Sequence, residues 1–129
     1  MILSSASLRA QRTADLLAER LEYTGRILYL RELYRTDPDV LLEILSMQDD
    51  EHETLFLIAH NPELSELANL LSPDHFGKIP ALGVVSLRFD IDVWSDLTEA
   101  DSGTTEFFIY PKQFRYFMPR QIRATLGHP

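Results

Sequence analysis

The stretch FLIAHNPELSELANLL, residues 56–71, joins an apolar run to a second apolar pattern through His60, Asn61 and Pro62. The run TLFLIA (54–59) is short and almost wholly apolar, which predicts a strand covered on both faces. After Pro62 the apolar residues recur at the spacing of one helix face, so we expect a helix with Asn61 as its N-cap. His60 is therefore predicted at the carboxyl end of a buried strand, directly before a helix N-terminus.

Strand and helix patterns alternate along the rest of the chain. We expect strands ending at Leu3 and over residues 26–30, 84–92 and 104–110, and helices that begin at Ser4 or Ser5 and at Asp37. The sequence contains no internal repeat, no low-complexity segment and no obvious linker. Strands that alternate with helices predict a layered α/β fold, and we expect residues 1–129 to form one domain.

Composition excludes several classes of protein. The chain has 129 residues, a net charge of −8 and no cysteine, so disulfides and thiolate chemistry are ruled out. The acidic balance argues against a general nucleic-acid binder, which needs a basic surface. No apolar run reaches the length of a membrane span, and no signal-peptide pattern opens the sequence. We therefore expect a cytoplasmic protein that binds neither nucleic acid nor membrane.

The basic residues at the end of the sequence are not balanced by acidic ones. All 20 acidic residues precede Phe107, whereas Lys112, Arg115, Arg120 and Arg123 follow it. Residues 112–129 thus form a basic C-terminal tail. Such a tail is ordinarily a solvated stretch, but it also fits a docking surface for an anionic or acidic partner.

Two strand-to-helix junctions carry side chains that bind anions. At the first, a helix N-terminus offers free amide hydrogens to an anion such as phosphate, and His60 beside it can donate a hydrogen bond or transfer a proton. At the second, Arg9 lies at the start of the predicted N-terminal helix and can grip phosphate with two hydrogen bonds. The alternatives are a histidine satisfied by backbone groups and an arginine exposed to solvent. The two junctions together favour a phosphate pocket.

Three segments in order resemble one family. LSSASLRAQRTADLL (3–17) resembles the Ser-Ser-x-x-x-Arg-Ala-x-x-Thr-Ala segment of the histidine phosphatase (phosphoglycerate-mutase-like) superfamily. LIAHNPELSELANLL (57–71) is similar to the second histidine block of its small SixA-type phosphohistidine phosphatases. KIPALGVVSLRFDIDVWSDL (78–97) is similar to their Met-Pro-Thr-x-Gly-Val segment.

The resemblance implies a fold and a reaction. The fold is a three-layer sandwich in which a mostly parallel sheet carries helices on both faces. Arg9 and His60 match the family's phosphate-binding and catalytic positions, whereas we give Ser5 and Asn61 only structural, capping roles. The implied substrate is a phosphorylated protein, phosphohistidine in particular, or a small phosphomonoester. We expect neither a cofactor nor a metal, since the scattered histidines show no ligand spacing.

The family's nucleophile is not found in this sequence. It is a histidine that follows arginine at the end of the family's first strand, and no Arg-His pair occurs here. We therefore expect a chain truncated at its N-terminus relative to the family, with the first strand missing. A chain without the nucleophile cannot carry out the covalent step. The alternative to a phosphatase is then a non-catalytic remnant that binds a phosphorylated or acidic partner, and unpaired strand edges favour a homodimer.

Overall fold

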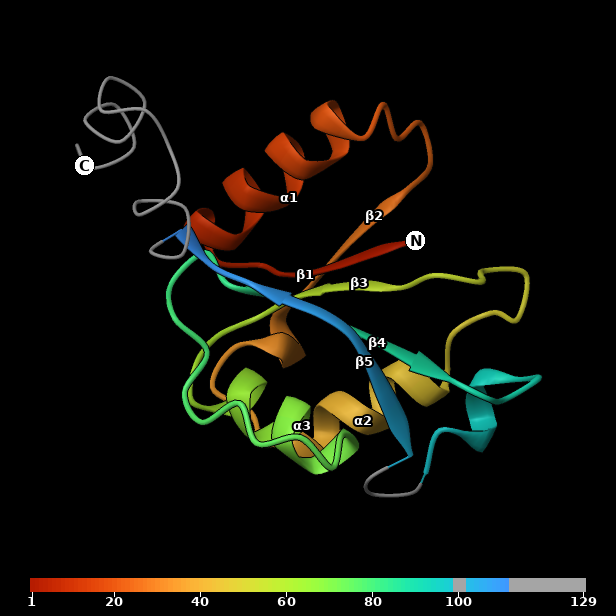
Figure 1. The fold of residues 1–129 in the computed structure, drawn as a ribbon. Coiled ribbons are helices and arrows are strands. Elements are labelled where there is room, and N and C mark those ends of the chain that lie inside the picture. The colour runs from red at the N-terminus through yellow and green to blue at the C-terminus, as the bar shows by residue number, and fades with distance from the viewer. Residues whose placement is uncertain (99–101, 112–129) are drawn as a thin grey trace.

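The computed structural model describes residues 1–98 and 102–111, and the predicted basic tail (112–129) lies outside them. A parallel sheet has the strand order β2-β1-β3, and a separate antiparallel ribbon pairs β4 with β5 (Figure 1). The elements, in chain order, are β1 (Ile2–Ser5), α1 (Leu8–Arg20), β2 (Ile27–Leu30), η1 (Arg31–Leu33), α2 (Pro38–Ser46), β3 (Phe56–Ile58), α3 (Glu63–Leu71), β4 (Val84–Phe89), η2 (Trp94–Asp96) and β5 (Gly103–Ile109).

Strand β1 is the centre of the parallel sheet and supplies both hydrophobic cores. It pairs with β2 along one edge and with β3 along the other. Because side chains alternate along a strand, Ile2 and Leu3 point to opposite faces. Ile2 packs with Ala14 and Ala18 of α1. Leu3 belongs to the larger cluster, whose other buried members include leucines of α2 and α3.

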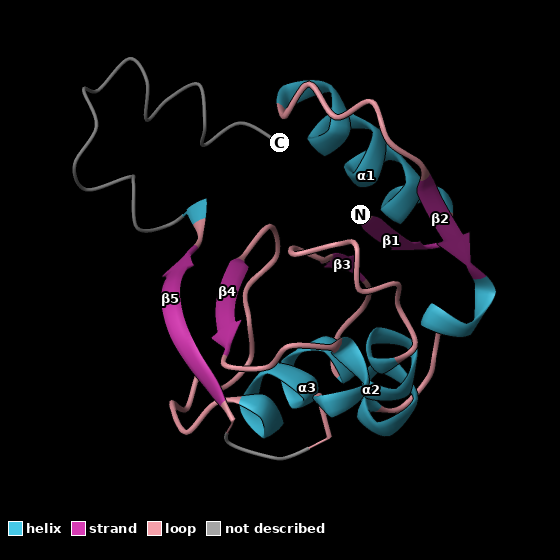
Figure 2. Cartoon of the chain, turned by 90° about the vertical axis from the view of Figure 1, so that its right-hand side faces the viewer, coloured by secondary structure: helices cyan, strands magenta, loops and turns pink. Residues whose placement is uncertain are grey.

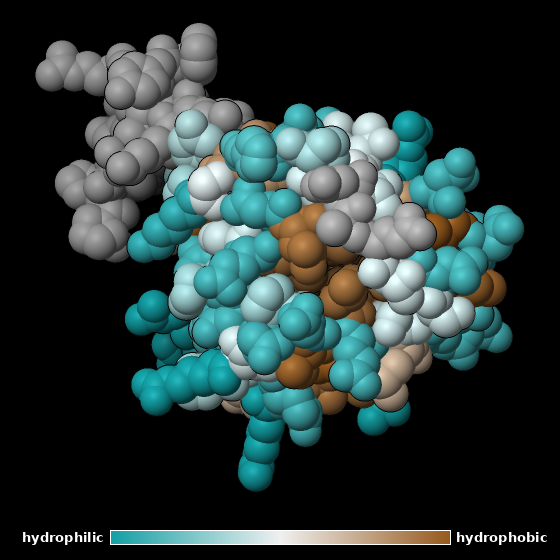
Figure 3. Space-filling model, turned by 90° about the horizontal axis from the view of Figure 1, so that it is seen from below, coloured by the Kyte–Doolittle hydropathy of each residue, from teal (hydrophilic) through white to brown (hydrophobic). Residues whose placement is uncertain are grey.

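Helices therefore cover both faces of the parallel sheet. Helix α1 lies on one face, and α2 and α3 lie together on the other (Figure 1). Together with the sheet they confirm the predicted α/β fold with helices on both faces. Seen from the side of α2 and α3, the molecule shows hydrophobic surface between hydrophilic side chains (Figure 3). None of the helices in the described part combines the length and the apolarity that a membrane span requires.

Two predicted helix starts can be compared with the structure. Asp37 is the N-cap of α2 as predicted, because its side chain accepts a hydrogen bond from the Val40 amide at 3.0 Å. The N-cap of α1 is Ser7 rather than Ser4 or Ser5, and that prediction was wrong. The parallel pairing of β1 with β2 continues through Ser5, so the strand is longer and the helix begins later.

Strand β3 is less buried than its apolar sequence predicts. All three of its residues are half-buried, although a strand covered on both faces was expected. Among the described strands β3 pairs with β1 only, and β4 pairs with β5 only. Strand β3 lies between the other parallel strands and the β4–β5 ribbon (Figure 2). One edge of β3 therefore has no strand partner in the described part of the chain.

The first prediction concerns Gly103, which begins β5 close to the end of α3. A Cβ atom at this position would lie 2.9 Å from the Leu71 carbonyl oxygen and 2.9 Å from the Phe89 ring. We expect Gly103→Ala to lower the free energy of unfolding by about 1–3 kcal/mol, since crowding a packed contact forces backbone shifts. Urea denaturation measures the effect. The exposed neighbouring substitution Thr104→Ser is the control, and equal stability of the two variants would contradict the close approach.

The second prediction concerns Tyr29 of β2, whose hydroxyl donates a hydrogen bond to Asp15 of α1. This hydrogen bond, with smaller effects of burial and of the carboxylate charge, raises the pKa of Tyr29 above its ordinary value. The neutral phenol is thus favoured in the folded state. Its contribution to stability is fully present below the unfolded pKa of about 10, and is lost as the pH rises through the higher folded value.

We expect Asp15→Asn to move the pKa of Tyr29 back towards its ordinary value, because the charged acceptor is removed. An NMR titration of the Tyr29 ring carbon measures it directly. Glu19→Gln, which removes another exposed carboxylate of α1, should leave the titration in place. An unchanged Tyr29 titration in Asp15→Asn would show that the pair does not persist in solution.

Candidate functional site

His60 lies just beyond the carboxyl end of β3, beside the carboxyl end of β1. The register pairs Ser4 of β1 with Ile58 of β3, which places Ser5 and His60 at the same edge of the sheet. The Nε2 atom of His60 is 2.8 Å from the Ser5 hydroxyl and 3.4 Å from the Ser7 hydroxyl. The histidine is half-buried. Within residues 1–98 and 102–111, the partners of its Nε2 atom are side chains, and not the backbone groups of the simplest alternative.

Ser5 does more than the structural, capping role that the sequence suggested. It is fully buried, and its hydroxyl also accepts a hydrogen bond from the Ser7 amide at 3.3 Å. Ser7 in turn caps α1 by accepting a hydrogen bond from the Ala10 amide. The contact between Ser5 and His60 joins residues 55 positions apart. Only the register of β1 against β3 brings them together, so the local sequence patterns gave no signal for it.

Tyr34 is a second residue of the site that sequence reasoning missed. It follows η1, the short turn after β2, and its ring meets the His60 ring edge to face at a centroid distance of 5.1 Å. The Arg35 guanidinium lies over the Tyr34 ring, 5.3 Å from its centroid. The position of Tyr34 shortly after a predicted strand was a signal that could have placed it at this edge. Segments following three parallel strands thus meet around His60.

Arg9 lies in the first turn of α1 and is exposed. Its side chain has no hydrogen-bond or ion-pair partner among residues 1–98 and 102–111, whereas its carbonyl accepts a hydrogen bond from Thr13. Ser7, two residues before it, lies within 3.4 Å of His60. The structure therefore brings the start of α1 to the same edge as His60, and the Arg9 guanidinium there is unpaired within the described part of the chain. The phosphate-binding roles of Arg9 and His60 stay predictions.

The start of α3 differs from the predicted capping. The N-cap residue is Pro62, which makes no side-chain capping hydrogen bond, so the expectation for Asn61 was wrong. Asn61 instead donates from Nδ2 to the Ile79 carbonyl at 2.8 Å and accepts from the Ser65 hydroxyl at 2.5 Å. Ser65 also accepts a hydrogen bond from the Ile79 amide. Asn61 thus ties the loop before β4 to α3.

The N-terminus of α3 attracts an anion, whereas acidic side chains in its first turn repel one. Without a side-chain cap, the amides of the first turn other than those of Leu64 and Glu66 remain available to an anion. The His60 carbonyl accepts the first helical hydrogen bond, from the Leu64 amide. Glu63 and Glu66 in the first turn reduce the positive potential of the helix dipole. The binding of an anion at this edge therefore depends on basic side chains such as Arg9 as well as on the helix N-terminus.

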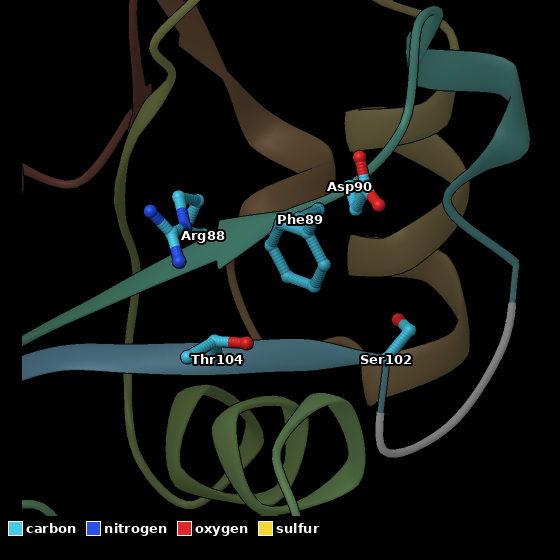
Figure 4. A pocket seen from close by; sticks show the side chains of 5 residues that line it. All are labelled: Arg88, Phe89, Asp90, Ser102 and Thr104. Carbon is cyan, nitrogen blue, oxygen red and sulfur yellow. The ribbon is translucent and has the colours of Figure 1, made fainter.

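A cavity elsewhere in the described part does not belong to this site. It has a volume of about 460 Å³ and is lined by Arg88, Phe89, Asp90, Ser102 and Thr104, all from the ends of β4 and β5 (Figure 4). Phe89 lies between Arg88 and Asp90, and the lining contains no histidine or cysteine. No group of three or more histidine or acidic side chains that could hold a metal occurs among residues 1–98 and 102–111.

Comparison with solved structures places this geometry in a known fold. The structure of a Nakamurella multipartitia protein assigned as the phosphohistidine phosphatase SixA superposes with a TM-score of 0.69 and 18% identity, covering 84% of this chain and 69% of that chain. A protein histidine phosphatase SixA complexed with tungstate superposes with a TM-score of 0.70 and 20% identity, covering 88% and 69%. The chain has the SixA fold. No protein-family model and no curated protein matches the sequence.

The third prediction separates capping from bridging at Asn61. We expect Asn61→Ala to lower the free energy of unfolding by about 1–3 kcal/mol, since the Ile79 carbonyl and the Ser65 hydroxyl, which belong to buried residues, lose their partner. Asn61→Asp is the discriminating variant, with urea denaturation as the measurement. Aspartate is as good an N-cap as asparagine but cannot donate to the Ile79 carbonyl. Full stability of Asn61→Asp would therefore restore the capping interpretation.

Proposed function

We propose that this protein binds the phosphoryl group of a phosphorylated protein or small phosphomonoester, and that it derives from SixA-type phosphohistidine phosphatases. The observation that carries the proposal is the position of His60 at the carboxyl edge of β3 in a SixA-like fold, held by a buried serine. The SixA structure with tungstate supports an oxyanion as the ligand, because tungstate is a tetrahedral anion like phosphate.

Each side chain has a distinct role in this proposal. The Arg9 guanidinium offers several N–H donors in a planar fork that matches two phosphoryl oxygens. His60 donates a hydrogen bond to a third oxygen, and free amides at the start of α3 add to the positive potential. Arg35, held over the Tyr34 ring, supplies a further cation near the same edge. These groups stabilise negative charge on a phosphoryl group, which is the electrostatic part of phosphoryl transfer.

The covalent part of the reaction needs a nucleophile that the printed sequence does not supply as an Arg-His pair. We propose that a phosphatase built on this chain takes the nucleophilic histidine from a further strand, paired with the free edge of β3. The half-buried apolar side chains of β3 support this position, as does the separation of the β4–β5 ribbon from the parallel sheet. The matches cover 69% of each SixA chain, so part of those chains has no counterpart here.

The second candidate function is a binding module without turnover. The sequence has no Arg-His pair to supply the nucleophile. The groups proposed to bind phosphate do not need that nucleophile, so binding without turnover is favoured. In this case the partner is a phosphorylated or acidic protein, and the basic residues at 112–129 would add to its binding. A homodimer formed through unpaired strand edges is compatible with either function.

The fourth prediction tests the shared phosphate site. We expect the purified chain to bind tungstate in isothermal titration calorimetry, and Arg9→Ala and His60→Ala each to weaken binding roughly 10- to 100-fold, the loss of about 1.5–3 kcal/mol for a hydrogen bond to a charged group. Arg20→Ala removes an exposed arginine from the last turn of α1 and serves as the control for net charge. Equal weakening by all three variants would indicate general electrostatic attraction and no defined site.

Turnover distinguishes the two functions. The chain of 129 residues is expected not to hydrolyse p-nitrophenyl phosphate. The coding DNA upstream of Met1 should be sequenced and translated in frame, and any longer product assayed in the same way. Turnover by a longer product that is lost in His60→Ala supports the phosphatase, whereas tungstate binding without turnover in the longest product supports the binding module. Hydrolysis by the chain of 129 residues, lost in His60→Ala, would show that no added nucleophile is needed.

A further inference from the structure

The buried Ser5 hydroxyl is the strongest constraint on the His60 ring. Ser5 is 0% exposed, and among the described residues its Oγ has two partners, the Ser7 amide at 3.3 Å and His60 Nε2 at 2.8 Å. Ser4, which is equally buried, directs its own hydroxyl to the Ser5 carbonyl and does not contact the histidine. The two adjacent serines are thus alike in burial and differ in their relation to His60.

Counting protons around Ser5 Oγ decides which ring nitrogen of His60 carries hydrogen. A hydroxyl has one proton to donate and two lone pairs to accept with, and a backbone amide can only donate. The Ser7 amide therefore occupies one lone pair, and among the described residues His60 Nε2 is the acceptor left for the Ser5 proton. If Nε2 carried a proton instead, the buried Ser5 proton would lose its acceptor, at a cost of about 1–3 kcal/mol. Nε2 is then the acceptor, and the ring proton lies on Nδ1.

The opposite side of the ring is left free for a ligand. No partner of Nδ1 occurs among residues 1–98 and 102–111, and the half-buried ring is contacted by Tyr34 edge to face. Ser7 also limits ring rotation, because its hydroxyl lies 3.4 Å from Nε2. A fixed N–H donor that faces away from its support is suited to an oxyanion, since no reorientation is needed when the ligand arrives.

We propose that Ser5 is a positioning residue that holds neutral His60 in the Nδ1–H tautomer, so that Nδ1–H is the atom that donates to the phosphoryl group. The part about the phosphoryl group rests on the proposed function. The same arrangement explains why His60 does not replace the missing nucleophile. In this tautomer Nε2 accepts the Ser5 hydrogen bond and Nδ1 has no free lone pair, so neither nitrogen is available to attack phosphorus.

The fifth prediction is tested by nitrogen-15 NMR of the chain labelled at histidine, at a pH where the ring is neutral. The chemical shifts of the two ring nitrogens report the tautomer, and His60→Gln identifies the His60 signals. We expect wild type to show the proton on Nδ1. Ser5→Ala should shift the population towards Nε2–H and weaken tungstate binding about 2- to 12-fold, which is the loss of one hydrogen bond worth about 0.5–1.5 kcal/mol. Ser5→Thr keeps the hydroxyl and should restore the tautomer.

Ser4→Ala is the matched control, because it removes a hydroxyl of equal burial that does not touch the histidine. It should leave the tautomer and tungstate binding unchanged. A wild-type ring with the proton on Nε2 would overturn the proposal without any substitution, and so would an unchanged tautomer in Ser5→Ala. Failure of wild type to bind tungstate would instead overturn the proposed function, and the tautomer measurement would still decide the role of Ser5.

Discussion

The burial of β1 between two parallel neighbours is the constraint on which the rest of the structure depends. Each of its four residues is buried, and their alternation sends Ile2 to the core under α1 and Leu3 to the core above α2 and α3. A central strand of a parallel sheet is covered on both faces, because the helices that connect parallel strands pack on those faces. The two hydrophobic layers on either side of β1 therefore fix where all three helices lie.

The same strand also builds the functional edge. Its last residue, Ser5, is as buried as Ile2 and yet polar, so its hydroxyl has to find partners inside the protein. It finds them in the Ser7 amide, which begins the turn into α1, and in His60, which follows β3. A single hydroxyl therefore links the end of one strand, the start of a helix and the side chain that carries the proposed chemistry. Moving β1 by one residue against β3 would break this link.

Local signals predicted the elements well, and long-range contacts account for what was missed. The Asp37-Pro38 pair specifies the start of α2 through an interaction between near neighbours, so the sequence alone placed it. The role of Asn61 was missed because Ile79, 18 residues away, becomes its neighbour only when the loop before β4 folds onto α3. Capping preferences compete with such tertiary hydrogen bonds, and at Asn61 the tertiary bonds prevail. The sequence patterns likewise predicted that His60 and Arg9 share one site. They did not indicate that Ser5 and Tyr34 contact His60 there.

The groups proposed to bind the phosphoryl group and the nucleophile proposed to attack it belong to different strands. The groups proposed to hold phosphate come from the segments after β1, β2 and β3, and their positions depend on the register of these strands, which the described residues already determine. A further strand on the edge of β3 that has no partner among the described strands, as proposed for the nucleophile, would add hydrogen bonds at that edge. The likeness to SixA shows the fold, so the binding half of the chemistry and the covalent half both stay proposals. In this architecture the tautomer of His60 matters for binding alone, because Ser5 has already engaged the nitrogen that could have attacked.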